Sequence, residues 1–450
     1  MSTVLQDGQM VLIAWILAGL VSMMGVFTYS GLASLTEEGG GQFEYFRIIF
    51  GPFFGYLFGW ACFTVIQSAS IASIAYVFAE SVNNLVPLGD PLAAYADVHI
   101  GTAIIPFSNS GVKILTIITI MILTMINYFG VRKGGILNNV FSTAKIAGIL
   151  ILILTGLVLS NVHAEDVQTS FQPVSPTGML LVSAMFTAML QAFWAYDGWI
   201  NVSYIGGEIK NPKRNIPIAI IGGTAVVMLL YVLVNMVFVH TMPTEQFMAI
   251  DQAGNKIAAA EVAQVLIPGF GFTLISVLIM ICTFGATNAS LMSSPRIYHQ
   301  MATKGLFFKV FGEVHPKYHT PHKSLILQMI WSSVLVISGS FDQLTNMLVF
   351  ASFIAYGSGA VGLLIMKYKG KVTTQENGSV DRLRITAKVI GFPVIPILFL
   401  LFCIGLVINT LFSQTEESLI GLGFIALGIP LYFVFRKQVP PAEQQPIDRQ

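Results

Sequence analysis

An aspartate and a glycine stand side by side near the middle of an apolar segment, residues 178–207, that is long enough to cross a bilayer. Moving an acid such as Asp197 to the centre of a bilayer costs about 3 kcal/mol on insertion scales. A glycine such as Gly198 beside a polar residue at that depth is typical of a helix that unwinds where it lines a cavity. The residues just before the pair are Trp194, Ala195 and Tyr196. The segment therefore predicts one half of a binding site, formed by these five residues.

Asp197 could bind an ammonium group, or a cationic side chain, through a charge-assisted hydrogen bond. The alternative is a protonated acid that is hydrogen-bonded to the neighbouring backbone. We favour the first interpretation because ionisable residues at this depth usually have a function. Asn201 and Ser203 add polar side chains to the second half of the segment, where they could face the same cavity.

Glu208 ends the segment and could act at a gate. Lys210, Lys213 and Arg214 follow shortly after it, so the carboxylate could pair with a basic residue when the inner side of the site closes. The alternative is a solvated carboxylate at a helix end, which contributes less than about 1 kcal/mol.

The composition is that of an integral membrane protein. Of the 450 residues, 55% are hydrophobic and 10% are charged, and the mean hydropathy is +0.76, whereas a soluble domain carries about 25% charged residues. Eleven apolar segments are near or above the length that a spanning helix needs: 10–33, 54–86, 111–130, 140–160, 178–205, 215–240, 268–293, 324–339, 343–366, 389–412 and 418–435. No strand-like alternation typical of a barrel is visible. The sequence thus predicts an all-α polytopic membrane protein with eleven transmembrane helices.

Basic residues lie on one side of this predicted bundle. If residue 1 faces outward, all of the 23 lysines and arginines except Lys113 and Lys256 fall on the inner side. The positive-inside rule then places the C-terminus in the cytoplasm, including a polar tail at 437–450.

Several other functions lack the residues that they need. The net charge of +1 indicates no nucleic-acid partner, and the three cysteines (Cys62, Cys282 and Cys403) lie in apolar segments without metal-site spacing. The apolar segments contain no paired carboxylates, no nucleophile with a base and no metal-spaced histidines. We therefore expect no enzyme activity, no cofactor and no metal. Four histidines in one inner connection are interpreted as solvated loop residues: His299, His315, His319 and His322.

Three stretches resemble the amino acid–polyamine–organocation superfamily, and most closely its branch of light-chain (L-type) amino acid transporters with their bacterial relatives. The stretches are AWILAGLVSMMGVFTYSGLASLTEEGGGQFEYFRIIFG, FWAYDGWINVSYIGGEIKNPKRNIPIAI and NASLMSSPRIYHQMATKGLFFKVFGEVHPKYHTP. They are similar to the second, sixth and eighth helices of that branch and the segments that follow them. Their order and spacing hold from Met1 to about Lys369, and the last two helices are less similar.

The resemblance implies a five-plus-five inverted-repeat transporter fold with two added helices, in which the first and sixth helices are broken at mid-membrane. Because the segment at 10–33 is similar to the family's second helix, the family's first helix is absent from the chain, and we expect it before Met1. The implied division is a single transmembrane domain, 1–450. It contains a truncated first repeat at 1–162, a second repeat at 176–369, two further helices at 370–436 and the tail.

The resemblance also implies roles for single residues. Trp194 matches an aromatic gate over the substrate, although a lone tryptophan also suits packing or an interfacial anchor. Lys145 matches a lysine whose ammonium takes the place of a sodium ion; the alternative is a side chain that extends to the membrane interface. Asn288 matches a helix that borders the site. Two positions depart from the family pattern: Ala289 stands where the family usually has glycine, and Gly31 where relatives carry a glutamate.

Taken together, the sequence predicts a sodium-independent amino acid permease or exchanger that works by alternating access. The alternative is a truncated, non-transporting membrane relative that lacks half of the substrate site. The family's eukaryotic members use an outer-loop cysteine to bond a heavy chain, and the corresponding loop, 83–110, has none. We therefore expect an amino acid substrate and a lipid bilayer as partners, no disulfide-linked heavy chain, and a bacterial-type plasma (inner) membrane as the location.

Overall fold

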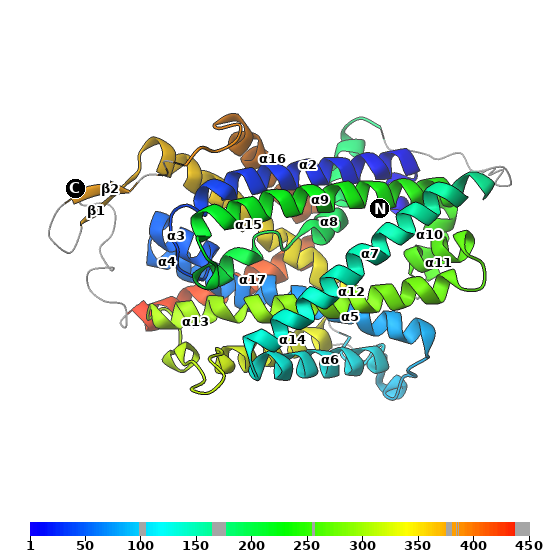
Figure 1. Ribbon diagram of the computed structural model, residues 1–450, viewed down its shortest axis with the longest axis horizontal. Coiled ribbons are helices and arrows are strands. Elements are labelled where there is room, and N and C mark those ends of the chain that lie inside the picture. The colour runs from blue at the N-terminus through cyan, green and yellow to red at the C-terminus, as the bar shows by residue number, and fades with distance from the viewer. Residues whose placement is uncertain are drawn as a thin grey trace.

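The computed structural model describes residues 1–98, 105–163, 177–253, 257–374, 380–383, 385 and 387–436. Helices run along the long axis of the molecule and are joined by connections at its two ends (Figure 1). The elements before the break near Asp197 are α1 (Ser2–Leu5), α2 (Gly8–Leu32), α3 (Gln42–Phe50), α4 (Pro52–Ala61), the π-helix η1 (Cys62–Ile66), α5 (Gln67–Leu85), the 3₁₀ helix η2 (Ala93–Tyr95), α6 (Ser110–Tyr128), α7 (Val131–His163) and α8 (Met179–Tyr196).

The elements after the break are the 3₁₀ helix η3 (Asn201–Glu208), α9 (Pro212–Thr241), α10 (Thr244–Ala253), α11 (Ala258–Leu266), α12 (Gly271–Ser293), α13 (Pro295–Thr303), the 3₁₀ helix η4 (Lys309–Gly312), α14 (His322–Ser338), α15 (Phe341–Tyr368), β1 (Lys371–Thr374), β2 (Val380–Leu383), α16 (Val394–Ser413) and α17 (Thr415–Phe435). The tail at 437–450 lies outside the described residues.

The prediction of a polytopic helical membrane protein is confirmed. Ten helices in the described part of the chain are long and apolar enough to span a membrane, and His322–Ser338 is a shorter apolar helix. Together they correspond to the eleven predicted segments. Local signals fix several boundaries: the Asp7 side chain accepts a hydrogen bond of 2.8 Å from the backbone N–H of Gln9 at the start of α2, and Ser340 with Gln343 forms a capping box at α15.

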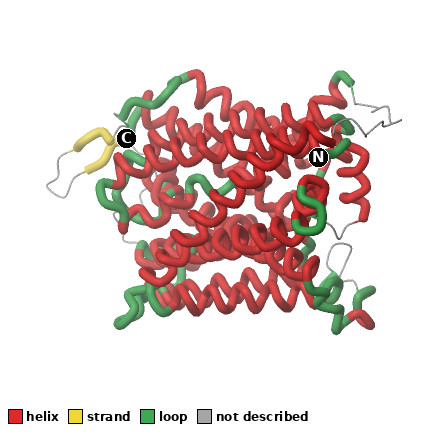
Figure 2. The backbone as a smooth tube through the Cα atoms, turned by 45° about the vertical axis from the view of Figure 1, so that its right-hand side comes forward, coloured by secondary structure: helices red, strands yellow, loops and turns green. Residues whose placement is uncertain are grey.

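A short hairpin departs from the all-α prediction. Strands β1 and β2 pair antiparallel, with Lys371 opposite Leu383, and they project beyond the helices at one end (Figure 2). Strands of four residues are too short to show a period-two pattern in the sequence, so composition alone did not reveal them.

One end of the bundle carries a group of basic side chains. We call the end formed by α3, α13 and η4 the basic end, since Arg47, Arg296, Lys304 and Lys309 lie on these elements or directly after them. The opposite end carries α1, α10 and α11 (Figure 1). Between the ends, α5 packs along α12, and α2 packs along α8 and α9. Helix α8 also packs against α15, and η3 packs against α9 and α12.

Candidate functional site

The helix predicted to break at Asp197 and Gly198 does so. Helix α8 ends at Tyr196, Asp197 is extended (φ −66°, ψ 161°), and Gly198 has φ +93°. The chain becomes helical again at Asn201, as the 3₁₀ helix η3. A glycine is required at position 198 because residues with a Cβ rarely adopt this φ. The break leaves main-chain groups of two half-helices facing one region of the bundle.

A cavity of about 580 Å³ lies beside the break. Six predicted site residues line it: Lys145, Trp194, Ala195, Asp197, Gly198 and Asn201. The carboxylate of Asp197 and the ammonium of Lys145 are the charged groups of the lining. The sequence interpretation missed the lining residues from other helices, among them Ser70, Tyr231, Thr283 and Ser290.

Tyr356 on α15 holds the Asp197 carboxylate. Its hydroxyl donates a hydrogen bond of 2.5 Å to Oδ1 of Asp197. The Tyr356 ring in turn contacts Trp199 and Tyr29, with ring centroids 5.1 Å and 5.9 Å away. The acid therefore has a side-chain partner from a distant helix, and its orientation is fixed by a packed aromatic group.

Aromatic side chains make contacts beside the cavity, at the end of α8. The Trp194 indole donates to Ser73 Oγ over 3.2 Å, and its ring meets Phe341 edge-on at 5.1 Å. The Tyr196 ring packs instead against the rings of Trp15 and Tyr231, with centroid distances of 5.9 Å and 5.1 Å. It does not line the large cavity.

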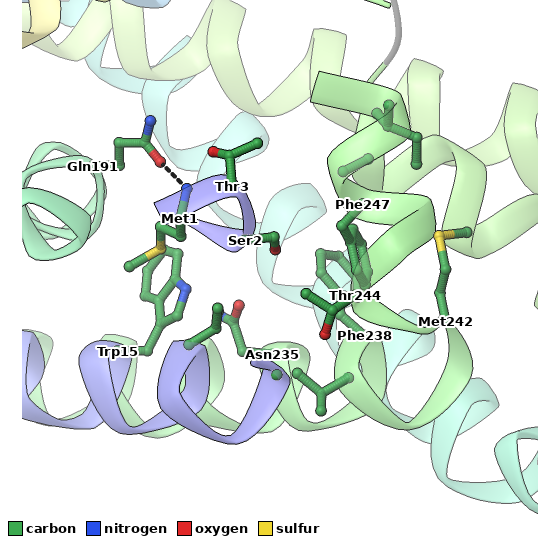
Figure 3. A pocket seen from close by; sticks show the side chains of 15 residues that line it. Met1, Ser2, Thr3, Trp15, Gln191, Asn235, Phe238, Met242, Thr244 and Phe247 are labelled. Atoms are coloured by element: carbon green, nitrogen blue, oxygen red, sulfur yellow. Dashed lines mark hydrogen bonds between the residues drawn. The ribbon is translucent and has the colours of Figure 1, made fainter. Parts of the chain in front are cut away.

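A second pocket of about 300 Å³ lies beyond Trp15, toward the opposite end. Its lining comes from α1, α2, α8, α9, α10 and α11. Met1, Trp15 and Gln191 lie on one side of it, and Asn235 projects between them and α10 (Figure 3). The amino group of Met1 donates to Gln191 Oε1 over 2.8 Å. Trp15 lines this pocket, and Tyr231 lines the large cavity. The rings of Trp15, Tyr196 and Tyr231 contact one another and lie between the two cavities, and we call them the aromatic wall.

Comparison with known proteins identifies the kind of protein that has this arrangement. Residues 3–435 match the family model described as amino acid permease. The chain belongs to the amino acid permease family. The permease is similar to the mouse b(0,+)-type amino acid transporter 1, at 29% identity over 427 residues that cover 94% of the chain and 80% of the relative.

Two further relatives support the same assignment. The serine/threonine exchanger SteT of Bacillus subtilis is 25% identical over 436 residues, which cover 96% of the permease and 90% of SteT. The human large neutral amino acids transporter small subunit 2 is 26% identical over 426 residues, covering 94% and 73% of the two chains. The family and these relatives are transporters and not enzymes, so the permease is a multi-pass membrane protein that transports amino acids.

Lys145 lines the permease cavity from helix α7. It is carried by α7, is half-buried, and faces the cavity together with Cys282 of α12. Among the described residues, no carboxylate lies within ion-pair distance of its ammonium. The Lys145 side chain therefore lines the cavity.

Glu208 forms an ion pair, but with a different partner from those that follow it in the sequence. Its two carboxylate oxygens accept from Nε and Nη2 of Arg296 on α13, over 2.5 Å and 3.1 Å. The Arg296 side chain is 10% exposed and that of Glu208 is 51% exposed. Lys213, one of the expected partners, pairs instead with Glu37 over 3.3 Å. The pair ties the end of η3 to the basic end.

Two other predicted residues do not reach the cavity. Ser203 is buried where η3 approaches the connection before α3, next to Gly41. The side chain of Asn288 is fully buried and accepts a hydrogen bond of 2.8 Å from the Asn127 amide, so it joins α12 to α6. Both residues contribute to helix packing near the site and do not line it.

The interpretation of the four histidines as solvated loop residues is wrong for three of them, since His299, His315 and His322 are partly buried. His315 and His322 pack edge-on at 5.1 Å and both contact the ring of Tyr128. Burial, followed by the charges of the neighbouring histidines and lysine, lowers the pKa of His315. His319 is exposed, as expected, and His299 is half-buried. No group of side chains in the described residues has the arrangement of a metal site.

Proposed function

We propose that the permease is a sodium-independent exchanger that moves amino acids across the membrane by alternating access. The observation that carries the proposal is the position of Asp197. Its carboxylate lies at the wall of the cavity, at the point where the helix is interrupted, and Tyr356 fixes its orientation. A fixed acid at mid-membrane depth is the group that recognises an ammonium.

The two half-helices would complete the recognition of an α-amino acid. The last carbonyl groups of α8 carry partial negative charge and suit the substrate ammonium, together with Asp197. The first N–H groups of η3 carry partial positive charge and suit the substrate carboxylate. In this proposal Trp194 closes the cavity toward the opposite end, and Glu208 with Arg296 closes it toward the basic end.

Lys145 would supply the fixed cation that makes transport independent of sodium. Its half-buried ammonium faces the cavity from α7. A tethered charge can organise oxygen ligands in the place of a bound metal ion. The relatives named above include a serine/threonine exchanger, which supports exchange as the mode of transport.

The distribution of charge supports an orientation in the membrane. We place the basic end in the cytoplasm, by the positive-inside rule, and the permease in a bacterial-type plasma membrane. The connection at 83–110 contains no cysteine, so no disulfide-linked heavy chain is proposed. The division into repeats at 1–162 and 176–369, with further helices at 370–436, is part of the same proposal.

Exchange by the purified permease in proteoliposomes tests the proposal. Vesicles loaded with unlabelled amino acids should take up a labelled amino acid faster than empty vesicles, at the same rate when choline replaces sodium. Lys145→Met should lower this exchange about tenfold, whereas Lys323→Met, which removes a partly exposed lysine paired with Glu313, should not. Uptake no greater than in protein-free vesicles would overturn the proposal in favour of a non-transporting relative. A requirement for sodium would overturn the role of Lys145.

A further inference from the structure

A chain of buried side-chain hydrogen bonds lies between the substrate cavity and the basic end. The Gln42 amide donates to the hydroxyl of Tyr29 over 3.0 Å, and the Tyr204 hydroxyl donates to Gln42 Oε1 over 3.0 Å. The three side chains are 2% exposed or less. They come from α2, α3 and η3, so the chain joins three separate segments inside the bundle.

Both ends of this chain lead back to the interrupted helix. The Tyr29 hydroxyl donates to the carbonyl oxygen of Ala355 over 3.0 Å, and the next residue, Tyr356, holds Asp197. At the other end, Tyr204 lies on η3, the segment whose last residue is Glu208. The hydrogen bonds therefore connect the residue at the break with the half-helix that follows it, through α15, α2 and α3.

Gln42 occupies the central position because it uses both polar atoms of its amide. Its nitrogen serves Tyr29 and its oxygen serves Tyr204, so the side chain can satisfy both partners in one orientation only. If η3 moved away from α3, the Gln42 oxygen would lose its donor while still buried, and such a loss is costly. The two hydrogen bonds of Gln42 therefore favour the position of η3 against α3.

The backbone just before Gln42 packs closely against η3. The N–H of Gly40 donates to the carbonyl oxygen of Tyr204 over 2.9 Å. A Cβ at Gly41 would lie 2.2 Å from Ser203 Oγ, and Gly41 has φ +50°. Only glycine fits at this contact, which brings the connection before α3 directly against the half-helix.

We propose that Tyr29, Gln42 and Tyr204 form a latch, in which Gln42 positions η3 and so sets how often the basic end is open. This inference rests on the proposed alternating access. Opening the basic end requires η3 to separate from α3, which breaks the Tyr204–Gln42 bond together with the Glu208–Arg296 pair. The latch residues act through η3 and do not touch the substrate.

Tyr204→Phe tests the latch, because it removes one hydroxyl and keeps the ring. Backbone hydrogen exchange of residues 201–209 and 36–44 should become about tenfold faster, as expected for the loss of one buried hydrogen bond. Gln42→Leu should give a similar change, and Tyr29→Phe a smaller one, because the bond to η3 remains. In amino acid exchange assays, the KM for substrate supplied at the basic end should fall, and the KM for substrate supplied at the opposite end should rise. The kcat should change little.

The matched control is Tyr298→Phe. Tyr298 is also fully buried and its hydroxyl also donates to a glutamine side chain, that of Gln328 on α14. This variant should not change the backbone hydrogen-exchange rates of residues 201–209. It should also leave unchanged the ratio of the KM values measured on the two sides of the membrane. Wild-type exchange rates at 201–209 in folded Tyr204→Phe permease, or equal effects of Tyr204→Phe and Tyr298→Phe, would overturn the latch. Hydrogen exchange needs no transport, so failure of the latch is distinguishable from failure of the proposed function.

Discussion

The proposed closures at the two ends of the permease consist of different kinds of contact. At the basic end, Glu208 pairs with Arg296 and η3 is hydrogen-bonded to α3. Toward the opposite end, Trp194 packs on Phe341, and Tyr196 packs on a second group of rings. Partly exposed ion pairs contribute little net free energy and weaken in salt. Aromatic contacts bury apolar area, which salt does not screen. The two closures should therefore respond to different perturbations.

The largest effect is expected from Trp194→Ala. The substitution removes the ring that contacts Phe341 and the indole that donates to Ser73. Truncating a packed aromatic side chain costs about 3 kcal/mol when it is fully buried, and Trp194 is half-buried. We expect the exchange rate in proteoliposomes to fall about tenfold or more, and Trp194→Phe to retain most of it. Wild-type exchange by Trp194→Ala would show that the rings do not close the cavity.

A smaller effect is expected from removing the ion pair at the basic end. Arg296→Gln or Glu208→Gln should lower exchange about fivefold, since a charge-assisted pair of this kind contributes about 1 kcal/mol when one partner is half exposed. Glu313→Gln is the control, because Glu313 forms an equally short pair with Lys323 away from η3.

Charge reversal sharpens this second prediction. The double variant Glu208→Arg with Arg296→Glu restores attraction between the two positions, so it should exchange faster than either single reversal, with a coupling of about 1 kcal/mol. If the loss of exchange rate in the double variant equalled the sum of the losses in the two single reversals, on a free-energy scale, Glu208 and Arg296 would not be coupled.

The smallest effect is expected from salt. Raising the ionic strength from about 0.05 M to about 0.5 M shortens the screening length and should weaken the ion pairs of the basic end. We expect the hydrogen exchange of 201–209 to accelerate about twofold in the wild type and less in Arg296→Gln. If salt accelerated hydrogen exchange equally in residues 186–196, beside the aromatic wall, the expected difference in salt sensitivity between the two closures would be contradicted.

The sequence predicted most of the fold, because membrane-spanning helices are defined by local composition. All eleven apolar segments became helices, and the interruption at Gly198 was visible as a glycine beside an acid inside one of them. The short hairpin β1–β2 escaped detection since its strands are too brief to show a period.

The site was predicted less completely, because its partners are distant in the sequence. Tyr356 is 159 positions from Asp197, Arg296 is 88 positions from Glu208, and Tyr204 is 162 positions from Gln42. Periodicity shows which face of a helix is apolar, but it does not show which residues of two helices meet. A single sequence also gave no reason to separate Asn288, which packs between helices, from residues that line the cavity.

Equilibrium binding of a radiolabelled amino acid to the purified permease tests the central assignment most directly. Asp197→Asn keeps the size of the side chain and removes its charge, so the affinity should fall about tenfold or more. Glu313→Gln should bind as the wild type does. Equal affinities of the wild type and Asp197→Asn, for an amino acid that the wild type binds and transports, would contradict the account.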